Sequence, residues 1–392
     1  ADSLLHQRVL KFLINRTPSA RLFLIEKCNQ KVDYAHSIFE VDPKRHWDTF
    51  YLGSMSKQKV RELIHQSAKL NPKIDPEKAV EKITKDINSL NLHRIPQNVS
   101  MLLRVLEEKT EYTPLNRAEV VGRYFEIILG RFFERLDYHE TLDFKDKIHL
   151  LSNLSEVMVR EQSYCFDLSF WVNFSNQYKE NFGKEFDTKR ELDLFIKSGI
   201  FSELMGKYSF KFSMWTKYFI ANQMNKDADF QNYILENRKY FSYPEVIEFA
   251  AGIERDQTTL VLELEQHLLG YIENIENDTG LSDSFDPYSD LRFGGTEEQA
   301  KHFEGAVVEE VTGKSLSQIE KDDTNDTTHN PMRPYQQAIS EKFISENLSC
   351  MYSCMKALGL CLRNSEHVQR TVRIRAAETL FTSVFRLSQT IF

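Results

Sequence analysis

Glycine and proline are scarce in this sequence, and it has no long apolar run. The 392 residues include only 14 glycines and 10 prolines, which favours a compact, helix-rich protein over a disordered one. No stretch of about 18 apolar residues occurs, so the sequence predicts no transmembrane helix. The five cysteines are scattered and odd in number, which is typical of a reducing cytosol. We therefore expect a cytoplasmic protein that is not in the membrane.

Motifs for common catalytic chemistry are also missing. The sequence has no H-E-x-x-H pair and no G-x-S-x-G elbow. Gly313-Lys314-Ser315 is similar to the end of a phosphate-binding loop, but Val308 stands where G-x-x-x-x-G-K-(S/T) requires its first glycine. No pair of acids follows an apolar strand in the manner of a Walker B motif. We identify no catalytic residue, so the sequence leaves open whether the protein is an enzyme.

Three cysteines share one face of a predicted helix near the C-terminus. Cys350, Cys354 and Cys361 are spread over three turns, with His367 following. Zinc requires four ligands that converge on one point, which thiols spread along a helix cannot provide. A free cysteine packs as a small apolar side chain. We therefore predict buried core cysteines and no metal site.

The balance of charge argues against a broad nucleic-acid surface. The net charge is −8, and 28% of the residues are charged. Arg370, Arg373 and Arg375 form a local basic face on the last predicted helix, either solvated or in contact with an anion or a partner.

With 41% hydrophobic residues the chain can bury a sizeable core, and its length suggests two to four domains.

The most informative stretch is Ser198–Met224. Tyr208, Phe210 and Phe212 alternate with polar residues, which predicts a strand with one buried face. From Trp215 onward the apolar spacing becomes helical, with Tyr218, Phe219, Ala221 and Met224 on one stripe. A strand that leads directly into an aromatic helix indicates the end of a winged helix. An ordinary αβ corner in a larger core is the alternative.

Helical patterns account for most of the remaining chain. Ser56 is a good N-cap for a helix over 57–68, and Asp75-Pro76 begins the next helix. Leu22–Ile25 reads as a buried parallel strand. Further helices are predicted over 99–108, 116–136, 143–160, 168–182, 188–198, 229–271 with a break at Tyr243-Pro244, 335–362 and 368–392.

The stretch around Tyr208–Ala221 resembles the end of the winged helix in STAND NTPases, the NACHT-like signalling ATPases. Its pattern there is F-x-(H/F)-x-x-(F/W/Y)-x-(E/K/Y)-Y-F-x-A, which Phe210, Phe212, Trp215, Tyr218, Phe219 and Ala221 match. Many members carry His at the position of Phe212, where it meets the β-phosphate of ADP. Phe212 cannot make that contact. The resemblance implies that Phe212, Lys217 and Tyr218 belong to an interdomain latch.

Other segments follow the family's order. Leu22–Ile25 looks like the sensor strand, after which Glu26-Lys27-Cys28 replaces the usual Thr-Ser-Arg, so Lys27 is the nearest candidate for a nucleotide contact. IPQNVSMLLRVLE resembles the motif whose proline packs against adenine, which assigns that contact to Pro96. RKYFSYPEVIEFAAGI resembles the start of the family's second helical domain.

The resemblance implies a mainly α fold with a residual α/β tail of a P-loop ATPase domain. The expected parts are the tail (1–55), a first helical domain (56–125), a winged helix (126–225), a second helical domain (226–275), a linker or mobile loop (276–334) with a short helix over 296–312, and a helical C-terminal segment (335–392). That last segment suits the first repeat of an α-solenoid, although no second copy is found.

The implied function is a regulatory switch that couples ligand sensing to ADP/ATP exchange and oligomerisation, in bacterial antiphage defence. Because both ends have the pattern of a cut chain, we expect nucleotide-binding and effector domains upstream of Ala1. ATP or ADP with Mg²⁺ is expected only with that domain, and the chain alone should bind nucleotide weakly or not at all. Expected partners are those domains, further copies of the chain and a phage protein at the C-terminal sensor. A non-enzymatic helical scaffold or adaptor, or less readily a winged-helix DNA-binding regulator, remains the alternative.

Overall fold

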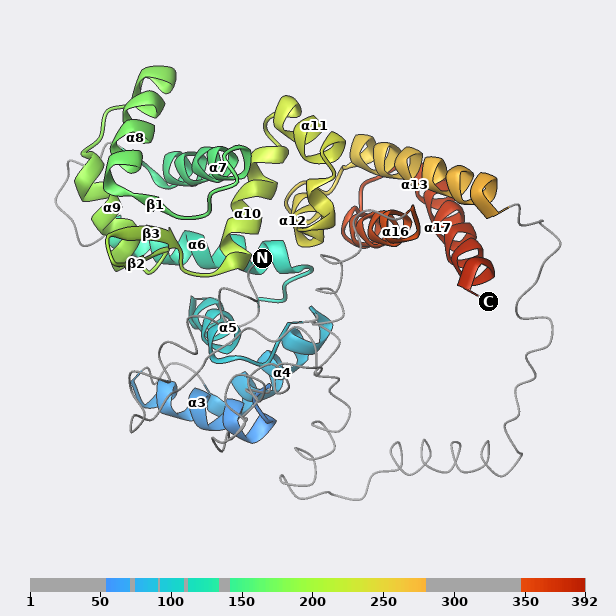
Figure 1. Cartoon of the computed structure of the whole chain (residues 1–392). Coiled ribbons are helices and arrows are strands. Elements are labelled where there is room, and N and C mark those ends of the chain that lie inside the picture. The colour runs from blue at the N-terminus through green and yellow to red at the C-terminus, as the bar shows by residue number, and fades with distance from the viewer. Residues whose placement is uncertain are drawn as a thin grey trace, which may run out of the picture. The chain divides into compact units, whose positions relative to one another are not determined.

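The computed structural model describes residues 54–70, 75–90, 92–108, 112–133, 142–279 and 347–391. Within these ranges the chain is mainly helical, with one small antiparallel sheet, which confirms the predicted fold class (Figure 1). No helix of this described part is long and apolar enough to cross a lipid bilayer. The strand predicted at Leu22–Ile25, with Lys27 after it, and the linker predicted beyond Thr279 lie outside the described residues.

Helices α3, α4 and α5 begin where local capping chemistry places them. The backbone N–H of Lys59 donates to Ser56 Oγ (3.2 Å) at the start of α3, and N–H groups of Glu77 and Lys78 donate to Asp75 (3.1 and 3.4 Å) at the start of α4. Both predicted starts are confirmed. The helices span Lys57–Leu70, Pro76–Ser89 and Pro96–Glu108, so α5 begins three residues before the predicted helix because Pro96 suits the first helical position.

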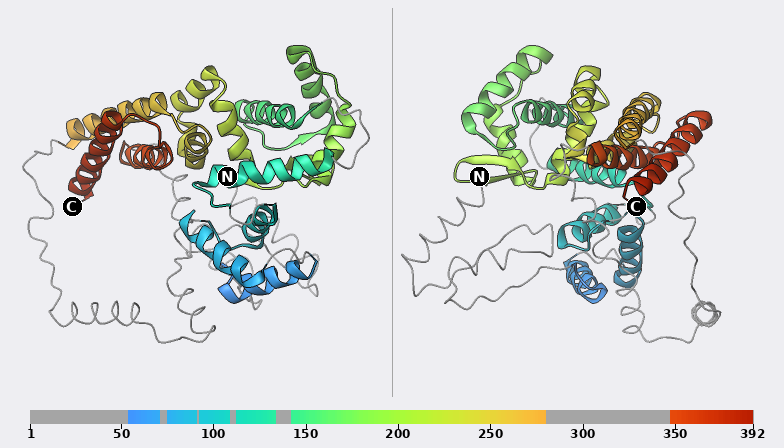
Figure 2. Two further views of the ribbon diagram at one scale, coloured as in Figure 1. Left: turned by 180° about the vertical axis from the view of Figure 1, so that it is seen from behind. Right: turned by 45° about the vertical axis from the view of Figure 1, so that its right-hand side comes forward.

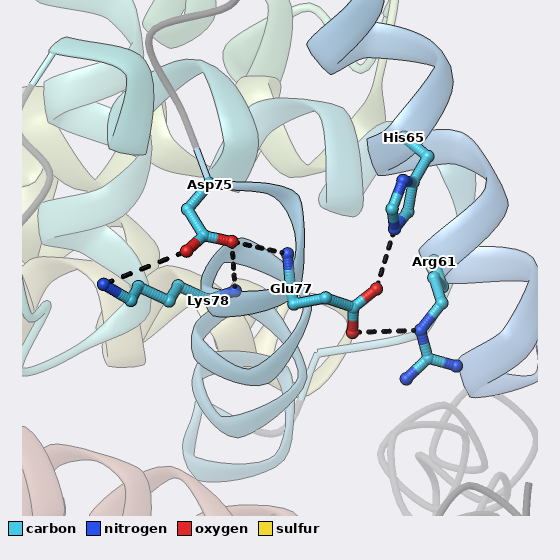
Figure 3. Close-up of polar contacts among 5 residues, drawn as sticks. All are labelled: Arg61, His65, Asp75, Glu77 and Lys78. Atoms are coloured by element: carbon cyan, nitrogen blue, oxygen red, sulfur yellow. Dashed lines mark hydrogen bonds and ion pairs between the residues drawn. The ribbon is translucent and has the colours of Figure 1, made fainter. Parts of the chain in front are cut away.

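Glu77 joins α4 to α3 through two side chains (Figure 3). Its Oε1 lies 2.7 Å from His65 Nε2, and Arg61 Nε lies 3.3 Å from its Oε2. The hydrogen bond with His65, followed by Arg61, lowers the pKa of Glu77 although burial raises it. Because Glu77 is half exposed, this contact orients the two helices, while buried Val60, Ile64, Val80, Ile83 and Ile87 stabilise them.

The next two helices lead into a small three-stranded module. Asp143 and Asp146 form a reciprocal capping box at the start of α7. The strand order is β1-β3-β2, all antiparallel, with Phe201 opposite Phe210 and Phe166 opposite Tyr208. The elements are α6 (Arg117–Phe133), α7 (Phe144–Arg160), β1 (Phe166–Asp167), α8 (Leu168–Phe182), α9 (Thr188–Lys197), β2 (Phe201–Leu204), β3 (Lys207–Phe210) and α10 (Ser213–Met224). A helix, a strand, two helices and a hairpin in this order have the topology of a winged helix.

The predicted strand over Tyr208–Phe212 is two residues too long. β3 ends at Phe210, and Phe212 is the extended N-cap residue of α10. Gly206, with φ of +74°, and Met205, with φ of +51°, form the tight turn that joins β2 to β3. The break predicted at Tyr243-Pro244 within the helical stretch 229–271 is confirmed, but the structure has two further breaks that were not predicted.

The breaks divide this region into α11, a 3₁₀ turn η1, α12 and α13. Arg238 adopts a φ of +52°, which ends the helical path before η1. Pro244 begins α12, and the chain turns again at residues 254–257 before α13. The bounds are Ala228–Glu236, Lys239–Phe241, Pro244–Ile253 and Thr258–Thr279; α16 (Asn347–Asn364) and α17 (Arg370–Ile391) follow.

Helices α13, α16 and α17 lie side by side (Figure 2). Arg375 Nη2 contacts Glu265 Oε2 (2.6 Å) and Arg386 Nε contacts Glu276 Oε1 (2.8 Å), so α13 and α17 are parallel. Arg375 is therefore part of a helix contact, although its side chain is exposed like those of Arg370 and Arg373. Cys350, Cys354 and Cys361 are buried in this layer, as predicted.

Helix α16 also packs against α12, so elements before residue 280 and after residue 346 share one core. The predicted domain boundaries at 125/126 and 275/276 fall inside α6 and α13. Each of these two predicted boundaries would therefore divide one continuous helix between two domains. The division into domains remains a prediction.

Gly252 allows α12 to approach α6 closely, which yields a test of this packing. A Cβ at Gly252 would lie 2.8 Å from Ala118 Cβ and 2.9 Å from Asn116 Oδ1. We expect Gly252→Ala to lower the free energy of unfolding by about 1–3 kcal/mol, because overpacking displaces both helices. Gly270→Ala is the matched control, since no described atom lies within 4 Å of its Cβ position in α13. That variant should gain about 0.5–1 kcal/mol in urea unfolding, and equal effects of the two changes would contradict the packing described.

Candidate functional site

The aromatic side chains of the Tyr208–Ala221 run are anchored on Phe125 of α6. Phe125 is fully buried, and its ring lies 5.5 Å from that of Trp215 and 4.8 Å from that of Phe219. Phe210 stacks on Phe219 at 5.3 Å. These edge-to-face and tilted contacts stabilise beyond the area they bury. The predicted buried stripe of α10 is thus confirmed, and it attaches the small sheet to α6.

Phe212 and Tyr218 have different surroundings. Phe212 is half buried, with its ring edge-on to Trp215 at 4.6 Å. Tyr218 is buried between Phe125 (5.4 Å) and Phe249 of α12 (6.0 Å). Burial raises the pKa of Tyr218 to about 12, so its hydroxyl is neutral at physiological pH. Its hydroxyl lies against Gly122, so a single ring connects α10 to α6 and α12.

Lys217 joins α10 to the first turn of α12. Its Nζ lies 2.9 Å from Glu245 Oε1, and the two side chains are 22% and 18% exposed. Burial raises the pKa of Glu245, but the charge and hydrogen bond of Lys217 outweigh burial, so the pKa is lowered overall. The carboxylate also lies at the positive end of the α12 dipole. Lys217 therefore pairs with an acid on a neighbouring helix of the same compact unit.

A second ion pair joins α6 to the same side of α12. Arg117 Nη1 lies 3.0 Å from Glu248 Oε2, and the side chains are only 13% and 5% exposed. The Arg117 guanidinium also lies 5.5 Å from the ring centroid of Phe249. Glu245 and Glu248 are three residues apart on α12, so they occupy one face of it.

Lys356 of α16 brings a third cation to these acids. The pKa of Lys356 is lowered to about 8, mainly by burial. The nearby charge of Lys217 also lowers this pKa, whereas the charges of Glu245 and Glu248 raise it. We call Arg117, Lys217, Glu245, Glu248 and Lys356 the junction cluster. It takes side chains from α6, α10, α12 and α16.

The chemistry of the junction cluster suits a mechanical role. Removing one partner of a buried ion pair typically costs about 3–5 kcal/mol, because the other charge stays desolvated. The four helices are therefore held together by buried charges, and separating these charges costs free energy unless water can solvate them. Among the described residues, no three His, Cys, Asp or Glu side chains are placed to hold a metal ion.

Pro96 lies apart from α10, at the first position of α5, which packs on α3, α4 and α6. Its ring is exposed, and the loop before it is held by Met55 N–H donating to the Arg94 carbonyl (2.7 Å) and Asn98 Nδ2 donating to the His93 carbonyl (2.9 Å). An exposed, rigidly held ring could lie flat against an adenine. Lys217 and Tyr218 lie on α10 and Phe212 is its N-cap residue, while Lys27 is outside the described residues.

Sequence reasoning identified Lys217 and Tyr218 but missed Arg117, Glu245, Glu248 and Lys356. The spacing of Glu245 and Glu248 inside an apolar helix was the available signal, since two acids on one face of a buried helix require cations. Which cations meet them depends on how the helices pack.

No protein-family model matches this chain, and no curated protein matches it. The resemblance to STAND NTPases therefore rests on the motifs alone.

The lowered pKa of Lys356 predicts an unusual pH dependence of stability. Its folded pKa of about 8 lies below the ordinary value of 10.5, so the unfolded chain binds more protons between these values. Stability from this group should therefore rise as the pH increases from 8 to 10.5. One pKa unit corresponds to about 1.4 kcal/mol, and partial exposure reduces the expected gain to about 1–2 kcal/mol.

Urea unfolding at pH 7.5 and pH 10 of Lys356→Met measures this contribution. The variant should lack that part of the wild-type rise, whereas Lys189→Met, a change of an exposed lysine on α9, should keep it. A Lys356→Met profile parallel to wild type would show that the Lys356 ammonium is not destabilised by burial.

Proposed function

We propose that this chain is the regulatory switch portion of a STAND, NACHT-like NTPase that couples ligand sensing to ADP/ATP exchange and oligomerisation. The observation that carries the proposal is the junction cluster, which joins the last helix of the winged helix to α12 and α16. Lys217 and Tyr218, two residues of the family motif, make that connection. The helix–strand–helix–helix–hairpin order of residues 144–210 supports it further.

The switch would work through two packings of the same helices. In the resting state Lys217 holds α10 to Glu245 of α12, and Lys356 of α16 lies near both acids of α12. A ligand that binds the C-terminal helices would alter the position of α16 and with it the charge balance around Glu245 and Glu248. Because the cluster is linked to α10 and α6 together, that change would reach the winged helix.

Pro96 is the residue of this chain that would contact the nucleotide. ATP or ADP, with Mg²⁺, would be held mainly by an upstream P-loop domain. The resting state would depend on the charge of the nucleotide's phosphate groups. Within this chain, the exposed Pro96 ring offers an apolar face for the adenine. Phe212, which stands where many members carry a phosphate-binding His, packs on Trp215 instead.

The biological setting follows from the same resemblance. We place the protein in the cytoplasm of a bacterium, as a defence sensor whose activated form is a homo-oligomer and whose trigger is a phage protein at the C-terminal helices. The parallel stacking of α13 and α17 suits such a helical sensor.

Charge reversal at Lys217 tests the latch. Lys217→Glu places a second carboxylate beside Glu245, which should weaken the α10–α12 contact and shift the resting population by about 1–3 kcal/mol toward the open state. We expect light scattering after size-exclusion chromatography to detect oligomers in the absence of a trigger. The variant monomer should remain folded, because both side chains are partly exposed. The double variant Lys217→Glu/Glu245→Lys should restore the monomer. Lys197→Glu, at an exposed position on α9, is the control.

If Lys217→Glu leaves both thermal stability and oligomerisation unchanged, Lys217 is no part of a latch. A scaffold or adaptor without a switch would then be the better interpretation of the helical core.

Pro96→Ala tests the adenine contact in the protein with its expected nucleotide-binding domain. We expect less nucleotide retained after purification and an almost unchanged melting temperature, because alanine is tolerated at the first position of a helix. Pro76→Ala is the matched control, since Pro76 occupies the same position of α4. Equal nucleotide retention in the two variants would show that Pro96 serves only to begin α5.

A further inference from the structure

The outer face of α17 exposes three large apolar side chains. Phe381 is 74% exposed, Ile374 is 47% exposed and Val384 is 46% exposed. Their spacing of seven and three residues places them on one side of the helix, over a length of about 15 Å. Single exposed apolar side chains are ordinary, whereas an aligned group of them indicates an interaction surface. We call Ile374, Phe381 and Val384 the α17 stripe.

The α17 stripe points away from the helices against which α17 packs. Arg375 and Arg386 contact acids of α13, and a side-chain carbon of Leu380 lies 3.7 Å from the Cβ position of Gly359 in α16. Successive residues of a helix are rotated by about 100°, so these contacts occupy the sides of α17 that the stripe leaves free. Within the part of the chain that the structure describes, the stripe is therefore open to a further segment.

The N-terminal end of α17, beside the stripe, is positively charged. Arg370 and Arg373 are exposed, and neither side chain has an ion-pair partner among the described residues. Glu378 is the only acid in the sequence of this helix. A complementary segment would carry apolar residues along one side and an acid at the end that meets these arginines.

Residues 296–312 of the same chain, which lie outside the described residues, have this composition. Their sequence, TEEQAKHFEGAVVEEVT, contains five acids and one lysine. The spacing of Ala300, Phe303, Val307 and Val311 is that of an amphipathic helix with one apolar side. Glu310 falls beside that apolar side, near its C-terminal end.

We propose that residues 296–312 dock on the α17 stripe as an amphipathic helix that runs antiparallel to α17. In this arrangement Phe303 packs on Phe381, and Glu310 approaches the guanidinium of Arg373. Docking removes exposed apolar side chains from water, and the opposite charges fix the direction of the segment. The proposal does not depend on the proposed switch function.

The chain is long enough to reach this position. Arg386 Nε lies 2.8 Å from Glu276 Oε1, so the end of α13 lies beside the C-terminal half of α17. The 16 residues 280–295 can extend over about 50 Å, whereas α17, with 22 residues, is about 33 Å long. An antiparallel segment can therefore begin near Val384. Because the segment is tethered, its effective concentration is in the millimolar range, which favours it over a separate partner.

A labelled synthetic peptide of residues 296–312 is the probe, and fluorescence anisotropy measures its binding to the 392-residue chain and to a variant that lacks these residues. We expect the deletion variant to bind the peptide at least tenfold more tightly than wild type, because the tethered segment of wild type competes for the same surface. In the deletion variant, Phe381→Gln should weaken binding at least tenfold. Leu269→Gln, at an exposed position of α13, is the matched control and should leave binding unchanged.

Exchange of charge tests the direction of docking. Arg373→Glu in the deletion variant should weaken peptide binding, and a peptide with Glu310→Lys should recover much of the loss. Equal peptide affinity of wild type and the deletion variant would overturn the proposal, because the stripe would then be open in the intact chain. Absence of binding to the deletion variant at millimolar peptide would also overturn it. If light scattering then showed that variant to be a dimer, the stripe would belong to a contact between two copies.

Discussion

Burial of α12 is the constraint on which the described core depends. This short helix is enclosed by α6, α10, α16 and η1, so that nearly all of its residues, from Pro244 to Gly252, are buried. Its contact with α6 is possible only because Gly252 has no side chain. Any movement of one neighbour must therefore be accommodated by the others, since close-packed interiors respond by discrete rearrangement.

Two acids inside this enclosed helix require the cations around them. Glu245 and Glu248 could not be buried without compensation, and Lys217, Arg117 and Lys356 supply it from three different helices. A hydrophobic residue at each position would hold a static core equally well or better. We therefore centre the switch proposal on these buried charges.

The fold was largely predictable from local signals. Ser56, Asp75-Pro76 and Asp143 begin helices where expected, because capping depends on the few residues around the helix terminus. Errors occurred where an apolar pattern continued through a break. At Arg238 the chain adopts a left-handed conformation that the surrounding pattern does not reveal, and it does so because η1 and α12 must turn back onto α10 and α16.

The sequence by itself determined the helical class, the helix starts and the aromatic stripe of α10, because each follows from residues within a few turns of one another. It also placed Lys217 and Tyr218 on α10 and Pro96 at a helix start. Only the tertiary structure decided that Lys217 meets Glu245 and that Arg117 meets Glu248. These partners are distant in the chain, and the local sequence around a charged group does not determine which distant partner it meets. Packing of the apolar faces chooses among them.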